Sequence, residues 1–215
     1  MSIVTIRGQL ESGAPEVAKE VADRLQADYV DREIIAEVAT QLERKEQEVI
    51  EKEMPPSTLL GRIAETLGTS YVFGDATAGA YLPLGKIPLS DNRYLRALES
   101  VVTGLARSRT KPLVILGRGS QFILKDYSGI LHVLVVAPLE VRVKRVMERL
   151  KLDPEAARHE VTRYDNSLHE FFKRYFKVEP EDPVHYDLIV NTGRLSCQAA
   201  ASIVVNALPF KTLDS

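Results

Sequence analysis

The N-terminal stretch constrains the fold of this chain most strongly. An apolar run from Ile3 to Ile6 leads into a turn that contains Gly8 and Gly13, and an amphipathic segment then continues to Leu25. A β-prone run, a glycine turn and a helix in this order predict a phosphate-binding βα unit. A helix N-terminus offers free N–H groups and a positive dipole end to an anion, and glycines let the anion approach the backbone.

The turn matches only part of the P-loop pattern G-x-x-x-x-G-K-[ST]. Gly8 and Gly13 hold the glycine positions, but Ala14 replaces the lysine and Pro15 replaces the residue whose hydroxyl binds Mg. Pro15 also lacks an N–H group, and Glu11 adds a negative charge where polyphosphate would bind. The spacing alone is therefore equally typical of an ordinary strand, turn and helix without a ligand.

Length and composition favour a single α/β domain. The chain has 215 residues, of which 45% are hydrophobic, so one sizeable core with an insertion or a lid is the most economical arrangement. The net charge of -2 and the pI of about 6.1 argue against a general nucleic-acid or membrane-surface binder.

The lone Cys197 excludes a disulfide framework within the chain. The four histidines and this cysteine have no zinc-ligand spacing, so the sequence predicts no protein-held metal site. No apolar run is long enough to span a membrane, and we expect a cytoplasmic protein.

Strand-like and helix-like segments alternate along the chain. The expected strands are 2–6, 27–30, 112–116, 130–137 and 187–191. The expected helices are 14–25, 32–42, 91–107, one that starts at 138, one that starts at 153, and 196–208. Continuous apolar runs such as 112–116 are typical of strands buried on both faces of a parallel sheet. The predicted fold class is therefore α/β, with a three-layer parallel sheet of about five strands and right-handed crossovers.

Three further features bear on function. Residues 68–90 are rich in glycine, proline and aromatic residues, as in a long functional loop, and a short helix over 54–67 precedes them. The helices after residue 138 carry many arginines, which form either an ordinary solvated surface or a lid over phosphates. Arg118 lies just beyond the carboxyl end of the strand 112–116, where ligands bind in open α/β sheets.

Four collinear motifs resemble the cytidylate kinase-like family, a branch of the P-loop nucleoside monophosphate kinases. The motifs are Ser12-Gly13-Ala14, Tyr29 to Ile35, Val114 to Leu124 and Tyr186 to Ser196. The resemblance implies one P-loop NTPase-like domain over 1–215, with an acceptor-side insertion over about 40–90 and lid-like helices over about 142–178. It also implies transfer of a phosphoryl group from ATP, with Mg, to a nucleoside monophosphate of the CMP or dCMP type.

The resemblance also assigns roles to individual residues. The donor phosphates and the donor base would be held by Gly8, Ser12, Gly13, Thr192 and Gly193. The acceptor nucleotide would be held by Asp31, Arg32 and Arg118. The charge on the transferred group would be neutralised by Arg118, Arg142, Arg145 and Arg163, with Arg158 as an alternative to Arg163.

The chain departs from the family's pattern at positions that matter for catalysis. Glu11 and Ala14 stand where glycines are typical, Gly119 where an acceptor-reading aspartate is typical, and Leu168 where a lid arginine is typical. Because a charge-stabilising arginine can contribute ~10³ to 10⁵ in rate, a second hypothesis is a nucleotide-binding or regulatory protein that keeps the fold without turnover. The cations that could substitute are Arg7, Lys173 and Arg174. A scaffold without a nucleotide site is the third hypothesis, and a homodimer through residues 68–90 is one option.

Overall fold

The computed structural model of this chain describes residues 2–31, 33–44, 46, 49, 91–108 and 110–210. Several predictions fall wholly or largely outside these residues: the helix over 54–67, the loop over 68–90, most of the insertion over 40–90, and the role of Arg32. The single domain over 1–215 and the homodimer likewise stay predictions.

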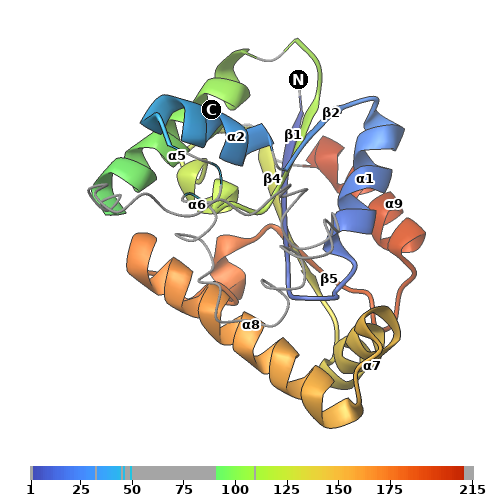
Figure 1. Cartoon of the computed structure of the whole chain (residues 1–215). Helices are drawn as coiled ribbons and strands as arrows, with labels where there is room; N and C mark the ends of the chain where they lie inside the picture. Colours follow the sequence, from blue (N-terminus) through green and yellow to red (C-terminus); the bar gives the residue numbers. More distant parts are fainter. Residues whose placement is uncertain are drawn as a thin grey trace, which may run out of the picture.

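The described strands form one parallel sheet (Figure 1). They are β1 (Ile3–Gly8), β2 (Asp28–Val30), β3 (Leu113–Leu116), β4 (Ile130–Val136) and β5 (Leu188–Asn191). Their order is β2-β3-β1-β4-β5, so β1 is central and pairs in parallel with β3 on one side and β4 on the other. The five predicted strands are confirmed, with ends that agree to within two residues.

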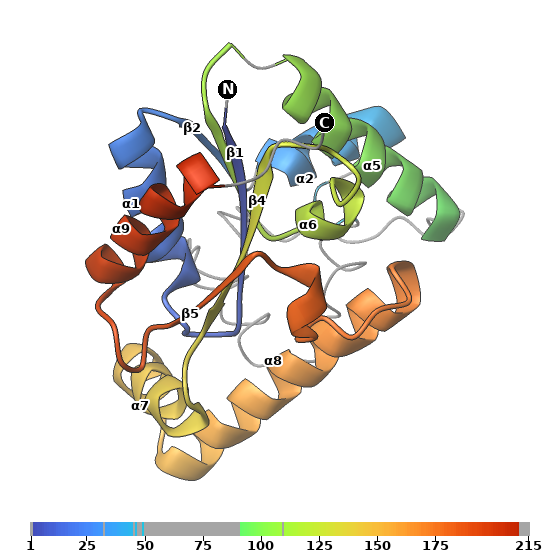
Figure 2. The same cartoon turned by 180° about the vertical axis from the view of Figure 1, so that it is seen from behind.

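Helices cover both faces of this sheet (Figures 1 and 2). They are α1 (Ala14–Leu25), α2 (Glu33–Leu42), α5 (Asp91–Ser108), α6 (Ser120–Ile123), α7 (Leu139–Leu150), α8 (Pro154–Tyr175) and α9 (Cys197–Ala207). On one face, α1 and α9 pack against Val4 and Ile6; on the other, α2, α5 and α6 pack against Ile3. The predicted three-layer α/β class is confirmed. No helix in the described ranges is long and apolar enough to cross a membrane.

The start of α1 follows directly from its sequence. Five small or β-branched residues recur at i, i+3, i+4, i+7 and i+8, and they form the buried stripe Ala14, Val17, Ala18, Val21 and Ala22. Gly13 precedes the helix at φ 81°, a left-handed conformation that glycine adopts without strain. The helix axis therefore begins at the end of the glycine turn, beside the carboxyl end of β1.

The α7–α8 pair lies beyond the carboxyl ends of the strands, as Figure 1 shows. Leu10, from the turn after β1, packs in a small apolar cluster with Val143 and Val146 of α7 and Val161 of α8. Asp153 begins α8 by accepting a hydrogen bond from Ala156 N at 2.9 Å. The first loop and the helical pair are thus packed against one another at the edge of the sheet where ligands bind in α/β folds.

Candidate functional site

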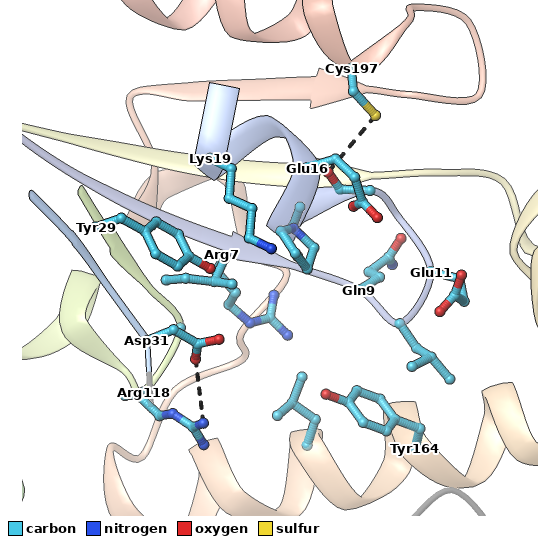
Figure 3. A pocket seen from close by; sticks show the side chains of 18 of the residues that line it. Arg7, Gln9, Glu11, Glu16, Lys19, Tyr29, Asp31, Arg118, Tyr164 and Cys197 are labelled. Atoms are coloured by element: carbon cyan, nitrogen blue, oxygen red, sulfur yellow. Dashed lines mark hydrogen bonds and ion pairs between the residues drawn. The ribbon is translucent and has the colours of Figure 1, made fainter. Parts of the chain in front are cut away.

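A pocket of about 580 Å³ opens at the carboxyl ends of β1, β2 and β3 (Figure 3). One end is formed by the loop after β1 and the first turns of α1. The other end is formed by Tyr29 and Asp31 after β2 and by Arg118 after β3, and α8 supplies a wall that includes Phe171 and Phe172. The topology therefore brings three separate strand ends to one cavity.

The loop end of the pocket contains a free helix N-terminus. Gly13, Ala14 and Glu16 all line the cavity. Among the residues that the structure describes, no side chain caps α1. The N–H groups of the first turn are available to an anion, except at Pro15, which has none.

The carbonyl groups of the loop are held by side chains from α7 and from the turn after β5. Arg145 Nη1 donates to Glu11 O at 2.8 Å, and Arg145 Nη2 donates to Thr192 O at 3.1 Å. The buried Thr192 hydroxyl donates in turn to Ser12 O. Because a trans peptide directs its C=O and N–H to opposite sides, this bond turns the Gly13 N–H away from Thr192. Arg145 and Thr192 therefore fix the conformation of the loop.

The residues predicted to hold the donor divide into two groups. Gly8 and Gly13 line the pocket, whereas Ser12, Thr192 and Gly193 lie outside its lining. Ser12 is fully buried beneath the loop. A Cβ on Gly193 would lie 2.3 Å from Pro138 Cδ, so this glycine allows the turn after β5 to approach the start of α7. The structure thus places Thr192 and Gly193 behind the loop.

At the opposite end, Arg118 and Asp31 meet across neighbouring strand ends. Arg118 Nη2 lies 3.4 Å from Asp31 Oδ1, and the two side chains are 9% and 30% exposed. Tyr29 stands beside them, and its pKa is raised by burial first and then by Asp31 and Glu33. This end combines one guanidinium with carboxylates and a neutral phenol, a set that can bind both an anion and hydroxyl or amino groups.

Arg7 places a buried positive charge at the floor of the pocket. It lines the cavity and is only 3% exposed. Its Nη2 lies 2.7 Å from Glu181 Oε1, its Nη1 donates to Pro180 O at 3.0 Å, and its guanidinium stacks 4.9 Å from the Phe172 ring centroid. The sequence does contain a signal for Arg7, because this charged residue follows the run Ile3 to Ile6 within the same strand.

The arginines of α7 and α8 are engaged in helix contacts. Arg142 is buried, and it forms two hydrogen bonds of 2.9 Å with the two carboxylate oxygens of Asp165. Arg163 Nη1 lies 3.4 Å from Glu160 Oε1, one turn earlier on α8. Arg158 pairs with a carboxylate on α7 at 2.6 Å. None of these three arginines lines the described pocket, whereas Arg118 and Arg145 do.

Comparison with known proteins identifies the family to which this chain belongs. The sequence matches the cytidylate kinase-like family over residues 3–194, a span that includes the first loop and all the strand ends. The chain belongs to the cytidylate kinase-like family. It is 31% identical to the cytidylate kinase of Halobacterium salinarum over 163 residues, which cover 71% of this chain and 82% of that enzyme.

Two other similarities are more limited. The chain is 33% identical over 98 residues to the uronate isomerase of Corynebacterium glutamicum, but it spans only 19% of that protein. An uncharacterized protein from Eubacterium ventriosum has a solved structure that matches with a TM-score of 0.67, at 17% identity, over 97% of this chain and 99% of that one. The structural match shows a shared fold.

Glu11, which departs from the cytidylate kinase-like pattern, is partly neutralised by α7. Its Oε1 lies 2.9 Å from Arg149 Nη2, and the two side chains are 18% and 25% exposed. Burial raises the pKa of the Glu11 carboxyl, and Arg149 opposes this shift. The Glu11 carboxylate is therefore paired with Arg149, and burial favours its neutral form. Both effects reduce the repulsion between Glu11 and a phosphate.

At a second departure, Gly119, an aromatic ring fills the space of a side chain. Gly119 has φ 68°, and a Cβ built on it would lie 2.4 Å from Phe176 Cζ. Any larger residue would displace this ring and strain the backbone. Phe176 therefore fills the space that an aspartate side chain would take at this position, and neither Gly119 nor Phe176 is part of the pocket lining.

At a third departure, α8 presents an apolar wall to the pocket. Leu168, Phe171 and Phe172 line the cavity together with Tyr164. Burial raises the pKa of Tyr164 to about 12, against the opposing effect of Arg118 and Arg7. The phenol stays neutral at physiological pH, and the wall can exclude water from a bound nucleotide.

Two charged side chains of α1 also reach the pocket, although neither was selected from the sequence. Figure 3 shows Lys19 and Glu16 projecting from this helix into the cavity. Lys19 forms no ion pair with any described residue. Cys197, at the start of α9, is half-buried and also lines the pocket. Burial, and to a lesser degree Glu16, raises the pKa of its thiol.

Glu16 offers one carboxylate beside the loop to a phosphate-bound Mg²⁺. Within the described ranges, no group of three or more His, Cys, Asp or Glu side chains could hold a metal. Mg²⁺ commonly takes only one or two carboxylates besides the phosphate oxygens of its nucleotide. Glu16 Oε2 lies 3.9 Å from the position of a Cβ on Gly13, beside the loop. Since Pro15 offers no hydroxyl, Glu16 is the candidate protein ligand.

Proposed function

We propose that this protein is a nucleoside monophosphate kinase-like phosphotransferase, which moves the γ-phosphoryl group of ATP to a CMP- or dCMP-type acceptor. Membership of the cytidylate kinase-like family supports the class of reaction. The observation that carries the proposal is one pocket with a free helix N-terminus at one end and the Arg118–Asp31 pair at the other. Two phosphate-binding ends in one cavity are what an in-line transfer between two nucleotides requires.

Each end has a defined part in this proposal. The N–H groups of Gly13 and Ala14 bind the donor phosphates. Glu16 would hold a Mg²⁺ ion, which would neutralise charge on the phosphate oxygens. Arg118 binds the acceptor phosphate. Asp31 orients the Arg118 guanidinium and accepts hydrogen bonds from polar groups of the acceptor. An acceptor phosphate oxygen then attacks the γ-phosphorus while the bond to the β-phosphate oxygen breaks, so ADP leaves as the donor product.

The test is transfer of labelled γ-phosphate from Mg-ATP to a panel of nucleoside monophosphates at high protein concentration. We expect label on CMP or dCMP, and loss of that label when Arg118 is replaced by alanine. Label on no acceptor, from a folded sample, would refute the proposal.

The second candidate is a nucleotide-binding or regulatory protein that has the fold without the chemistry. It is favoured by Arg142 and Arg163, whose guanidinium groups face Asp165 and Glu160 instead of the pocket. It predicts that CMP or ATP raises the melting temperature while no label is transferred. If neither nucleotide raises the melting temperature, the remaining hypothesis is a scaffold protein without a nucleotide site.

A further inference from the structure

We propose that Lys19 supplies the cation that the P-loop pattern places at position 14, and that its ammonium group contacts the transferred phosphoryl group. This inference rests on the proposed phosphotransferase function and names a residue that neither the loop pattern nor the arginine positions had indicated. It would explain how a polyphosphate binds at a loop that has Ala14 and Pro15 in place of the lysine and the hydroxyl residue.

The first residue of α1 brings no charge to the pocket. Ala14 is 3% exposed and belongs to the apolar cluster between α1 and the sheet, and it lies so close to position 8 that only glycine fits there. The cation that the pattern places at position 14 must therefore come from another element, or from further along the helix.

Helix geometry directs Lys19 toward the start of α1. Side chains on an α-helix point back toward its N-terminus, so a residue in the second turn covers the surface of the first. The long stem of Lys19 runs along this surface, and Figure 3 shows its ammonium group pointing into the cavity beside Tyr29. The group thus lies between the loop end and the acceptor end of the pocket.

Lys19 is also the cation of the described lining that no carboxylate or carbonyl holds. Arg7 is held by Glu181 and Pro180 O, Arg118 contacts Asp31, and Arg145 donates to loop carbonyls; Lys19 makes no ion pair or hydrogen bond with any described residue. An ammonium group is a compact charge with three donors on a flexible stem, which suits a phosphoryl group that moves during the reaction. A free cation between two phosphate-binding ends is placed to act on the group that passes between them.

This location predicts which measurements change. A cation that contacts the γ-phosphoryl group should affect phosphoryl transfer and triphosphate binding, and leave binding of ADP nearly unchanged. Lys19→Met keeps the length of the stem and removes the charge, whereas Lys19→Arg keeps the charge. Lys144→Met is the matched control, because Lys144 is 78% exposed on α7 and outside the pocket lining.

The experiment compares kcat, KM and nucleotide affinity for the wild type and these three variants. We expect Lys19→Met to lower kcat by about 10- to 100-fold, since a hydrogen bond to a charged group is worth about that factor, and to weaken a non-hydrolysable ATP analogue more than ADP. Lys19→Arg should recover part of the loss, and Lys144→Met should match the wild type.

The outcomes separate this inference from the function on which it rests. If the wild type transfers label and Lys19→Met equals Lys144→Met in every measurement, the role of Lys19 is refuted and the phosphotransferase stands. If Lys19→Met weakens ADP and the ATP analogue equally, the residue only supports the loop, and the inference is refuted. If the wild type neither transfers label nor binds the ATP analogue, the proposed function fails, and this inference fails with it.

Discussion

Replacing Arg118 by glycine tests the acceptor site without penalising the fold. Arg118 has φ 58°, between Gly117 at 71° and Gly119 at 68°, so three consecutive residues adopt the left-handed conformation. A non-glycine residue in this region costs ~1 kcal/mol, which glycine avoids. In the opposite direction, loss of the partly exposed contact between Arg118 and Asp31 removes ~0 to 1 kcal/mol of stabilisation.

These two contributions to the free energy of unfolding nearly cancel. The expected stability change is within about 1 kcal/mol, which corresponds to a melting-temperature shift of no more than about 4 °C for a chain of this size. Loss of a charge-assisted hydrogen bond to the acceptor phosphate costs ~1.5 to 3 kcal/mol, or about 10- to 150-fold in kcat/KM for the acceptor. Activity should therefore fall while stability is preserved.

The assay is steady-state transfer with the acceptor varied, alongside urea denaturation of the same samples. Lys151→Gly is the matched control, because Lys151 also has φ 56°, is exposed at the end of α7 and lies outside the pocket lining. This variant also loses one positive charge and one strained residue, and it should keep full activity. If Arg118→Gly retains the wild-type kcat/KM for the acceptor, Arg118 does not bind the acceptor phosphate.

Three other variants test the loop and the acceptor end. Burial raises the pKa of Glu11 above its ordinary value of 4.5, so its stabilising contribution is present below pH 4.5 and is lost as the pH rises through the folded-state pKa. Glu11→Gln should therefore be more stable than the wild type at pH 7, with the difference vanishing below pH 4.5 in urea denaturation; equal stability at pH 7 would contradict this. Gly119→Ala should destabilise the fold by ~1 to 3 kcal/mol, because of its positive φ and the displaced Phe176 ring, and an unchanged urea midpoint would show that the ring yields easily. Thr192→Val leaves the carbonyl of Ser12 without its donor and should raise the KM for ATP several-fold, whereas Thr192→Ser should not; equal KM values would mean that the loop holds its shape unaided.

Much of the fold could be predicted because the pattern of apolar residues is strongly periodic. In the apolar run 112–116, residues Leu113 to Leu116 form β3 and are all buried, and the stripe of α1 begins at Ala14 as expected. The short helix α6 was not predicted, because four residues after Gly119 carry too little periodicity to be distinguished from a turn. The order of the strands also required the structure, since local patterns carry no information about which strands pair.

The candidate site was harder to predict, because the partner of each charge is remote in sequence. Arg142 and Asp165 are 23 residues apart and on different helices, and no local rule pairs them. The spacing of Arg142, Arg145 and Arg149 at i, i+3 and i+7 did contain a signal, since it puts all three on one face of α7. A stripe of arginines on one helix face can point inward as readily as outward, and only packing decides between a wet surface and a structural role.

That stripe explains how the loop tolerates its own sequence. The loop lacks the P-loop lysine and contains Glu11. Without a nearby positive charge, the Glu11 carboxylate would repel a polyphosphate. Arg149 pairs with the Glu11 carboxylate, and Arg145, one turn earlier on the same face of α7, binds the carbonyl of the same residue. α7 thus provides positive charge to the loop: Arg149 pairs with Glu11, and Arg145, which also lines the pocket, is held by loop carbonyl groups. A cation that contacts the transferred group must then be one that is not committed to the loop, and the ammonium group of Lys19, which pairs with no described residue, lies between the two ends of the pocket.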